Sequence, residues 1–208
     1  MALGGVDAIK KMQSLTVHGE IEASGMKEKA TFVYYGKPFK SLFEAKRPDG
    51  TEITTGFDGQ VSWAVTPQGA SIDKETPVEA VRRDADLQYA LHQPDYFEKL
   101  ELAGITEFEG HRCYWLHGTT HWGKDNNQFY DVESGLLRGY RFQADDASKT
   151  VTVAIFDDYK NFGGPLVATT HTFRTGDHSQ TLIFKSVSYE PLPDSMFELP
   201  AAVKALVR

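Results

Sequence analysis

Histidine and cysteine gather in the middle of the chain, where these residue types could bind a metal ion. His117 and His121 stand in the sequence HGTTH, and His111 and Cys113 come just before them; imidazole and thiolate are the usual zinc ligands. The spacing lacks the H-E-x-x-H pattern of a zinc-binding helix. In an unbroken strand His117 and His121 would share a face but lie ~13 Å apart, too far for two ligands of one ion. We predict solvent-facing histidines and no metal site.

Catalytic pairs and nucleophiles are not indicated elsewhere. Asp145-Asp146 and Asp157-Asp158 are adjacent carboxylates, and neighbouring residues of a strand point to opposite faces, so neither forms a dyad. Asp145-Asp146 also has the character of a loop. Cys113 lies within a strand pattern, which predicts a packed thiol, and no G-x-S-x-G elbow is present. Gly163-Gly164 precedes a strand and offers no helix N-terminus to a phosphate. We predict no catalytic residue and no cofactor.

The composition is that of an acidic globular protein. The 208 residues fit a single domain spanning 1–208. A net charge of −7, with the basic residues scattered, argues against a nucleic-acid partner. No stretch approaches the ~18 apolar residues of a membrane span. The first residues do not resemble a signal peptide. We expect a periplasmic protein whose signal peptide has been removed, with a cytoplasmic location as the alternative.

Polar and apolar residues alternate through most of the chain, as Leu15, Val17 and Ile21 illustrate. This period predicts half-buried strands. Turn signals such as Asp58-Gly59 separate several of them. Many strands joined by tight turns predict a mainly β (α+β) fold with one large antiparallel sheet, which must curl and present a concave face. The strand-like runs lie at residues 14–23, 29–35, 39–46, 52–57, 60–66, 100–107, 112–119, 128–131, 137–143, 150–159, 167–175 and 180–189.

Residues 75–92 have a helical pattern instead. Thr76 and Glu79 form a T-x-x-E capping box around Pro77, which predicts the start of the helix. Leu87 and Leu91 lie on nearly the opposite side from the stripe that begins at Val78. Either the sheet and a second element cover the two sides, or the helix breaks near Leu87.

The two ends of the chain have patterns of their own. Residues 3–11 predict a short helix. Residues 191–200 resemble a closing strap that docks Phe197 and Leu199 on the sheet, and the tail from Ala201 is a short helix or frayed.

Large apolar side chains occur on several strands, often on both faces. Such strands must be covered on both sides or line a cavity. We predict a hydrophobic ligand site, with Leu87 and Leu91 as its lid. The predicted wall consists of Phe32, Tyr34, Trp63, Val65, Tyr114 and Leu116.

Six segments together resemble the LolA-like superfamily of bacterial lipoprotein carriers, in its divergent lipoprotein-sorting branch. They are LGGVDAIKKMQSLTVHGEI, GFDGQVSWAVTPQG, FEGHRCYWLHG, FYDVESGLLRGYRF, FDDYKNFGGPLVATTHTF and SVSYEPLPDSMFELP, and their order spans almost the whole chain. The resemblance implies an unclosed β-barrel with helices plugging its concave side. It also implies an apolar cavity for acyl chains and a periplasmic location after signal cleavage.

These observations favour a non-catalytic carrier of an acyl chain, a lipoprotein lipid moiety or another hydrophobic ligand in the bacterial envelope. Lipoproteins or envelope proteins are the expected partners. One alternative is an envelope-assembly or protein-interaction module that binds through a sheet edge without lipid. The other is an enzyme that reuses the fold, with His117, His121 or an aspartate in the cup.

Overall fold

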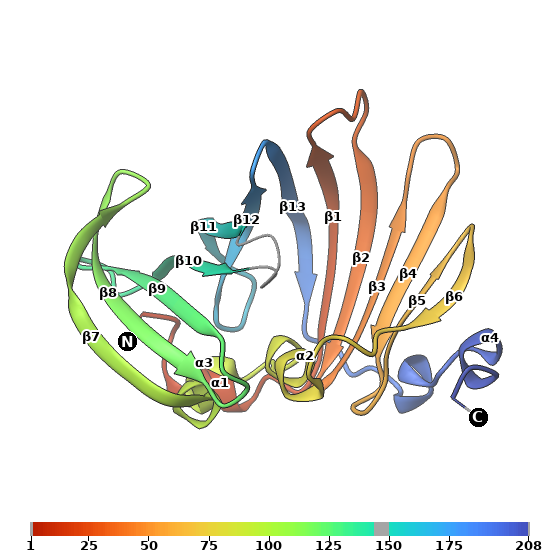
Figure 1. Cartoon of the computed structure of the whole chain (residues 1–208), viewed down its shortest axis with the longest axis horizontal. Helices are drawn as coiled ribbons and strands as arrows, with labels where there is room; N and C mark the ends of the chain where they lie inside the picture. The colour runs from red at the N-terminus through yellow and green to blue at the C-terminus, as the bar shows by residue number, and fades with distance from the viewer. Residues whose placement is uncertain (1, 144–149, 208) are drawn as a thin grey trace. The chain divides into compact units, whose positions relative to one another are not determined.

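In the part of the chain that the structure describes, thirteen strands form a single antiparallel sheet, which Figure 1 draws as a ribbon. The computed structural model describes residues 2–143 and 150–207. The strand order is β6-β5-β4-β3-β2-β1-β13-β12-β11-β10-β9-β8-β7, and within the described residues the two end strands do not pair with each other. The prediction of a mainly β fold with one large, unclosed antiparallel sheet is confirmed.

The elements have the following bounds. The strands are β1 (Leu15–Ala23), β2 (Ala30–Lys37), β3 (Lys40–Lys46), β4 (Glu52–Phe57), β5 (Ser62–Thr66), β6 (Gly69–Ile72), β7 (Phe97–Phe108), β8 (His111–Thr120), β9 (Asp125–Asp131), β10 (Leu137–Gln143), β11 (Val151–Asn161), β12 (Leu166–Thr175) and β13 (His178–Ser188). The helices are α1 (Val6–Lys10), α2 (Val78–Asp84), α3 (Tyr89–His92) and α4 (Ala201–Lys204), with 3₁₀ turns η1 (Gln93–Tyr96) and η2 (Asp194–Phe197). In the part of the chain that the structure describes, none of these helices has the length and apolar character of a membrane span.

The chain divides into two compact units. Unit 1 comprises residues 1–9, 22–26 and 90–183, and unit 2 comprises residues 10–21, 27–89 and 184–208. Strands β2 to β6 therefore belong to unit 2, and β7 to β12 belong to unit 1. Each unit has its own buried core.

In unit 2, the strands β1 to β4 bury one face that we call the Phe32 face. Its members are Val17, Phe32, Tyr34, Phe43 and Phe57, which cross-strand pairing brings to the same side. The rings of Phe32 and Phe43 stack with centroids 5.3 Å apart, and Phe184 meets Phe32 edge-on. Aromatic pairs in these geometries add to the stabilisation that area burial supplies.

The opposite side of unit 2, the Trp63 face, carries Tyr35, Leu42, Trp63, Val65 and Ile72. The C-terminal segment covers it, with Phe197 of η2 and Val203 of α4 fully buried against Leu42 and Trp63. The Lys37 ammonium donates to the Leu192 carbonyl at 3.1 Å and to Asp194 at 2.7 Å. The predicted strap is confirmed, including the docking of Phe197 and Leu199 and the short terminal helix.

The predicted helix over residues 75–92 is broken, as one of the two alternatives required. Helix α2 ends at Asp84, and the Asp86 carboxylate then accepts the Gln88 backbone N–H at 2.9 Å in a turn before α3 begins. The predicted capping box is wrong, because Pro77 is the N-cap and no side chain caps the helix. The Thr76 backbone N–H instead donates to the Asp73 carboxylate at 3.1 Å, and such an Asx turn competes with a Thr cap.

In unit 1, strands β7, β8 and β9 contribute to a small aromatic core, against which Val153 and Ile155 of β11 pack. Phe108 and Phe129 stack with ring centroids 4.2 Å apart, beside the fully buried Cys113. A Cβ on Gly139 would lie 2.7 Å from the Phe108 ring, so only glycine lets that ring lie flat on β10. The packed thiol predicted for Cys113 is confirmed, and its burial raises the pKa of the thiol.

Candidate hydrophobic ligand site

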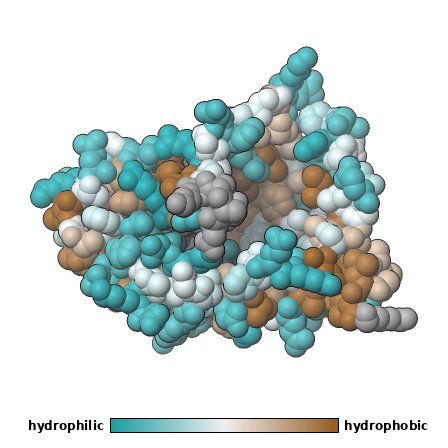
Figure 2. Space-filling model, viewed as in Figure 1, coloured by the Kyte–Doolittle hydropathy of each residue, from teal (hydrophilic) through white to brown (hydrophobic). Residues whose placement is uncertain are grey.

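An open apolar groove of about 490 Å³ lies on unit 1, over β7, β8 and β9. Cross-strand pairing sets Leu102 opposite Leu116 and Tyr114 opposite Tyr130, so these side chains form one continuous wall. Apolar residues are exposed over β7, at the left of the view in Figure 2. The groove is lined by Leu100, Glu101, Leu102, Tyr114, Leu116, Tyr130 and Gly135. Its volume falls in the range of small-ligand sites, roughly 300–1,000 Å³.

A bulge in β7 widens this apolar surface. Residues three apart on a regular strand point to opposite faces. Here the register shifts between Leu102 and Gly104, so Leu102 pairs with Leu116 and Ile105 pairs with Tyr114. Leu102 and Ile105 therefore reach the same side, and they are 62% and 50% exposed. Gly104 adopts φ 152°, a conformation that other residues rarely take.

Gly118 lets two side chains of β7 pack closely on β8. A Cβ at this position would lie 2.6 Å from Cδ1 of Phe97 and 2.9 Å from Cδ1 of Leu100. The absence of a side chain lets both residues pack directly on β8. Leu100 thereby becomes part of the groove wall instead of standing away from the strand.

One polar group adjoins the apolar wall, and it is uncharged. The Gln93 amide of η1 donates to the Tyr130 hydroxyl at 2.7 Å and to the side-chain carbonyl of Gln128, which is fully buried. The Tyr130 hydroxyl donates to that same carbonyl at 2.9 Å. These bonds fix the Tyr130 ring at the edge of the groove, because a buried amide must be satisfied by such partners.

The histidines near Cys113 do not form a common site. His121 is exposed, as predicted, whereas His117 is half-buried, with Nδ1 3.2 Å from the Asn127 side-chain oxygen. The register places His117 opposite Glu101, on the side away from Leu102 and Leu116. Within residues 2–143 and 150–207, no three His, Cys, Asp or Glu side chains are grouped to hold a metal ion.

The structure describes one of the two pairs of adjacent carboxylates, Asp157-Asp158. The Asp157 carboxylate accepts a hydrogen bond from Arg138 at 3.2 Å, and that of Asp158 accepts one from the Thr170 hydroxyl at 3.3 Å. The two carboxylates thus have different hydrogen-bond partners. Asp145-Asp146 lies outside the residues that the structure describes.

Three of the predicted site residues come together on unit 2. Phe32 and Tyr34 share the Phe32 face, and Leu87 lies over the same face, 2.8 Å from the position that a Cβ on Gly36 would occupy. Burial raises the pKa of the Tyr34 phenol to about 12, with a smaller contribution from the nearby Asp84 carboxylate. Leu91 lies in α3 and is half-buried.

Trp63 and Val65 do not join that group. They lie on the Trp63 face, on the other side of the sheet from Phe32, and the C-terminal strap packs on them. Tyr114 and Leu116 belong to the unit 1 groove, together with Leu100, Leu102 and Tyr130, which the sequence reasoning missed. The alternation of residues 112–119 identified the first pair. The apolar alternation of Leu100 and Leu102 within 100–107 was a signal that could have added two more.

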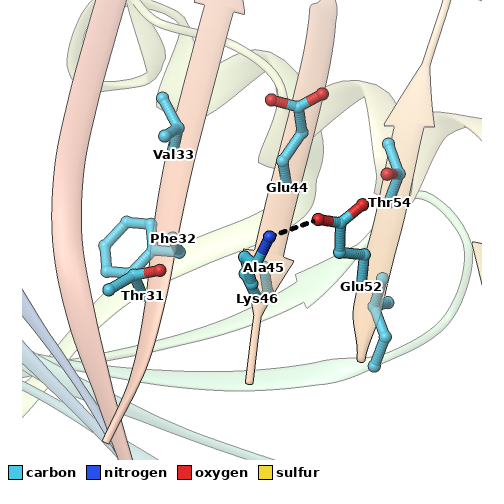
Figure 3. Close-up of a pocket in the computed structure, with 9 residues that line it drawn as sticks. Thr31, Phe32, Val33, Glu44, Ala45, Lys46, Glu52 and Thr54 are labelled. Carbon is cyan, nitrogen blue, oxygen red and sulfur yellow. Dashed lines mark hydrogen bonds and ion pairs between the residues drawn. The ribbon is translucent and has the colours of Figure 1, made fainter. Parts of the chain in front are cut away.

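A second depression, of about 300 Å³, lies on unit 2 and is more polar (Figure 3). Val33, Glu44 and Thr54 stand in one cross-strand row, with Thr31, Lys46 and Glu52 in the next. Lys46 and Glu52 pair at 2.9 Å, and both are well exposed. Because five of its nine lining residues are polar or charged, this depression suits a hydrophobic ligand less well than the unit 1 groove does.

The fold is found in several solved structures. A DUF1329 family protein from Desulfovibrio piger is similar over 94% of each chain, with a TM-score of 0.67 and 16% identity. A LolA superfamily protein from Nitrosomonas europaea has a TM-score of 0.60 and 14% identity, over 95% of this chain and 99% of that one. A lipoprotein-sorting protein domain from Vibrio parahaemolyticus, described as putative and outer-membrane, has a TM-score of 0.61 and 12% identity, over 97% and 96%.

The two comparisons made at the level of sequence found no match. No protein-family model matches the chain, and no curated protein matches it. Structural similarity at identities of 12–16% shows a common fold, but it does not show a common activity. The chain therefore has the fold of the LolA-like proteins, as its sequence segments predicted.

Proposed function

We propose that this protein is a non-catalytic carrier that binds an acyl chain, a lipoprotein lipid moiety or another hydrophobic ligand in the groove of unit 1. The observation that carries the proposal is the continuous wall of Leu100, Leu102, Tyr114 and Leu116, which remains open to solvent. Each methylene that moves from water onto such a surface contributes ~0.8 kcal/mol. A long acyl chain can therefore be held without a special polar group.

The chemistry of the groove supports binding over catalysis. Its lining consists of leucines, tyrosines, a glycine and one glutamate, Glu101. The Glu101 carboxylate pairs with Lys99 at 2.8 Å, on the side of the strand that His117 shares. None of these groups is a nucleophile held next to a general base, which acyl transfer or hydrolysis would require.

The similar folds support a role in the bacterial envelope. Two of them are a LolA superfamily protein and an outer-membrane lipoprotein-sorting domain. By analogy of fold, we propose a periplasmic location and a lipoprotein or another envelope protein as the donor or acceptor of the ligand. Fractionation of the host cells, with detection of the native protein in the periplasmic and cytoplasmic fractions, tests the location.

Native mass spectrometry of protein purified gently from its host, followed by lipid extraction, tests ligand binding. We expect a mass increment that extraction assigns to an acyl-containing species. A fluorescent fatty-acyl probe should also bind with an affinity that depends on the groove. Protein that is free of lipid and also fails to bind the probe would refute the carrier function.

One observation favours a second candidate, a module that binds a protein partner through its sheet edge. β7 ends the sheet, is 12 residues long and exposes Leu102 and Ile105. An edge strand can pair with an extended segment of another chain. Hydrogen exchange separates the two functions, because strand addition protects the backbone amides of β7 whereas an acyl ligand protects few of them.

A further inference from the structure

An arginine and a glutamate stand next to the apolar wall of the unit 1 groove. Tyr114 and Leu116 line the groove, and Arg112 shares their face of β8, because residues two apart on a strand point to the same side. Glu107 of β7 pairs with Arg112 across the strands, so its side chain reaches that face as well. The apolar rows of the wall are therefore followed by a row that carries one positive and one negative charge.

These two charges have no partner within the described part of the chain. Both side chains are exposed, and neither forms an ion pair or a side-chain hydrogen bond with another residue that the structure describes. The next acidic residue of the hairpin, Glu109, is by contrast paired with Arg174. Attraction between two exposed side chains contributes little, so a ligand can engage both Arg112 and Glu107 without first breaking a strong pair.

The length of the wall fits one acyl chain of a membrane lipid. Leu100 pairs with Gly118 at one end of the wall. At ~3.3 Å per residue, Tyr114 lies ~13 Å along β8 from Gly118, and Arg112 lies ~20 Å from it. A membrane acyl chain spans ~15 Å, half of the ~30 Å hydrocarbon core of a bilayer. A chain that lies along the wall from Leu100 therefore ends where the charged row begins.

We propose that the groove binds a single-chain amphiphile whose head carries a phosphate next to an ammonium group, as phosphoethanolamine does. This inference rests on the proposed function and specifies the ligand class of the same groove. The Arg112 guanidinium donates to the phosphate, which a planar guanidinium can bind through two hydrogen bonds. The Glu107 carboxylate on the neighbouring strand accepts from the ammonium. The head stays in contact with water, so the preference arises from charge complementarity and not from desolvation.

The test compares three ligands that share a palmitoyl chain and differ in the head: lysophosphatidylethanolamine, lysophosphatidic acid and monopalmitoylglycerol. Each displaces a fluorescent acyl probe near pH 7 at low ionic strength, where surface charges are least screened. We expect lysophosphatidylethanolamine to bind at least ~3-fold more tightly than each of the others. If either of them binds as tightly, the inference is wrong and the carrier function stands. Failure of all three ligands to bind would overturn the carrier function as well.

Two substitutions test the two charges separately. Arg112→Gln should abolish the preference for lysophosphatidylethanolamine over the glycerol ester, whose own affinity should stay unchanged. Glu107→Gln leaves the cation in place and should make lysophosphatidic acid, which carries only negative charge, the tightest ligand by ~3-fold. Both side chains are exposed, so both variants should fold normally.

The matched controls are Lys160→Gln and Asp177→Asn. They change the net charge in the same way at exposed positions that do not line the groove. We expect both controls to keep the order of affinities of the unmodified protein. An unchanged order in Arg112→Gln or Glu107→Gln, or the same changes in the controls, would refute the assignment of the head group to this row.

Discussion

Replacing Leu102 with alanine should weaken ligand binding and leave the fold intact. The side chain is 62% exposed in the free protein, and complete burial of a leucine contributes roughly 1.5–3 kcal/mol. A ligand that covers the exposed part therefore gains ~1–2 kcal/mol from it. Leu102→Ala should raise the dissociation constant of an acyl probe by about 5- to 30-fold, as measured by fluorescence titration.

The same substitution should leave the stability of the free protein almost unchanged. Because the ligand, and not the protein, completes the burial of Leu102, the free energy of unfolding in urea should change by less than ~0.5 kcal/mol. Val151→Ala is the control, because it removes a comparably exposed apolar side chain outside the groove. If Leu102→Ala binds the probe as tightly as the unmodified protein, or if Val151→Ala weakens binding equally, the groove is not the ligand site.

Three further outcomes follow from the packing. Gly118→Val should lower the free energy of unfolding by ~1–3 kcal/mol through overpacking, because a Cβ would lie 2.6 Å from the Phe97 ring; unchanged urea denaturation would contradict that contact. Trp63→Ala should lower the free energy of unfolding by ~3–5 kcal/mol in the same assay, since Trp63 is 4% exposed beneath the strap. The folded variant should keep its affinity for the acyl probe. A large loss of affinity would place Trp63 in the ligand site after all. Burial lowers the pKa of His171 to about 4, so below about pH 6.5 the unfolded chain binds a proton that the folded chain does not. Stability should therefore fall as pH decreases from about 6.5 to 4, by up to ~3 kcal/mol, and this part of the decline should vanish in His171→Phe; identical pH dependence in the two proteins would refute the assignment.

Strand positions were predictable because alternation is a local property. Residues 52–57 and 137–143 were predicted as strands and are β4 and β10 with the same bounds. The turn predicted at Asp58-Gly59 is present as well. The Asp58 carboxylate accepts the backbone N–H groups of Gln60 and Val61 at 2.8 Å. The short β6 was missed, because four residues, GASI, give too few periods to recognise.

The local signals failed where another interaction, local or between strands, competed with them. Thr76 has the sequence of an N-cap, but the Asp73 carboxylate accepts its backbone N–H, and the helix begins after Pro77. The bulge in β7 brings Leu102 and Ile105 to one side although their spacing predicts opposite faces. A bulge depends on pairing with the next strand, which periodicity along one strand does not encode.

The sequence by itself determined the mainly β architecture, the order of the strands along the chain and which residues of one strand share a face. Tertiary structure alone decided what covers each face. Phe32 and Trp63 look alike in the sequence, yet Leu87 lies over the Phe32 face and the strap with Phe197 covers the Trp63 face. Tertiary structure also decided that nothing covers most of the Leu102 side chain, which stays open to solvent on the terminal strand. The reason is that side-chain direction follows from the backbone of one strand, whereas burial depends on segments that are distant in the sequence.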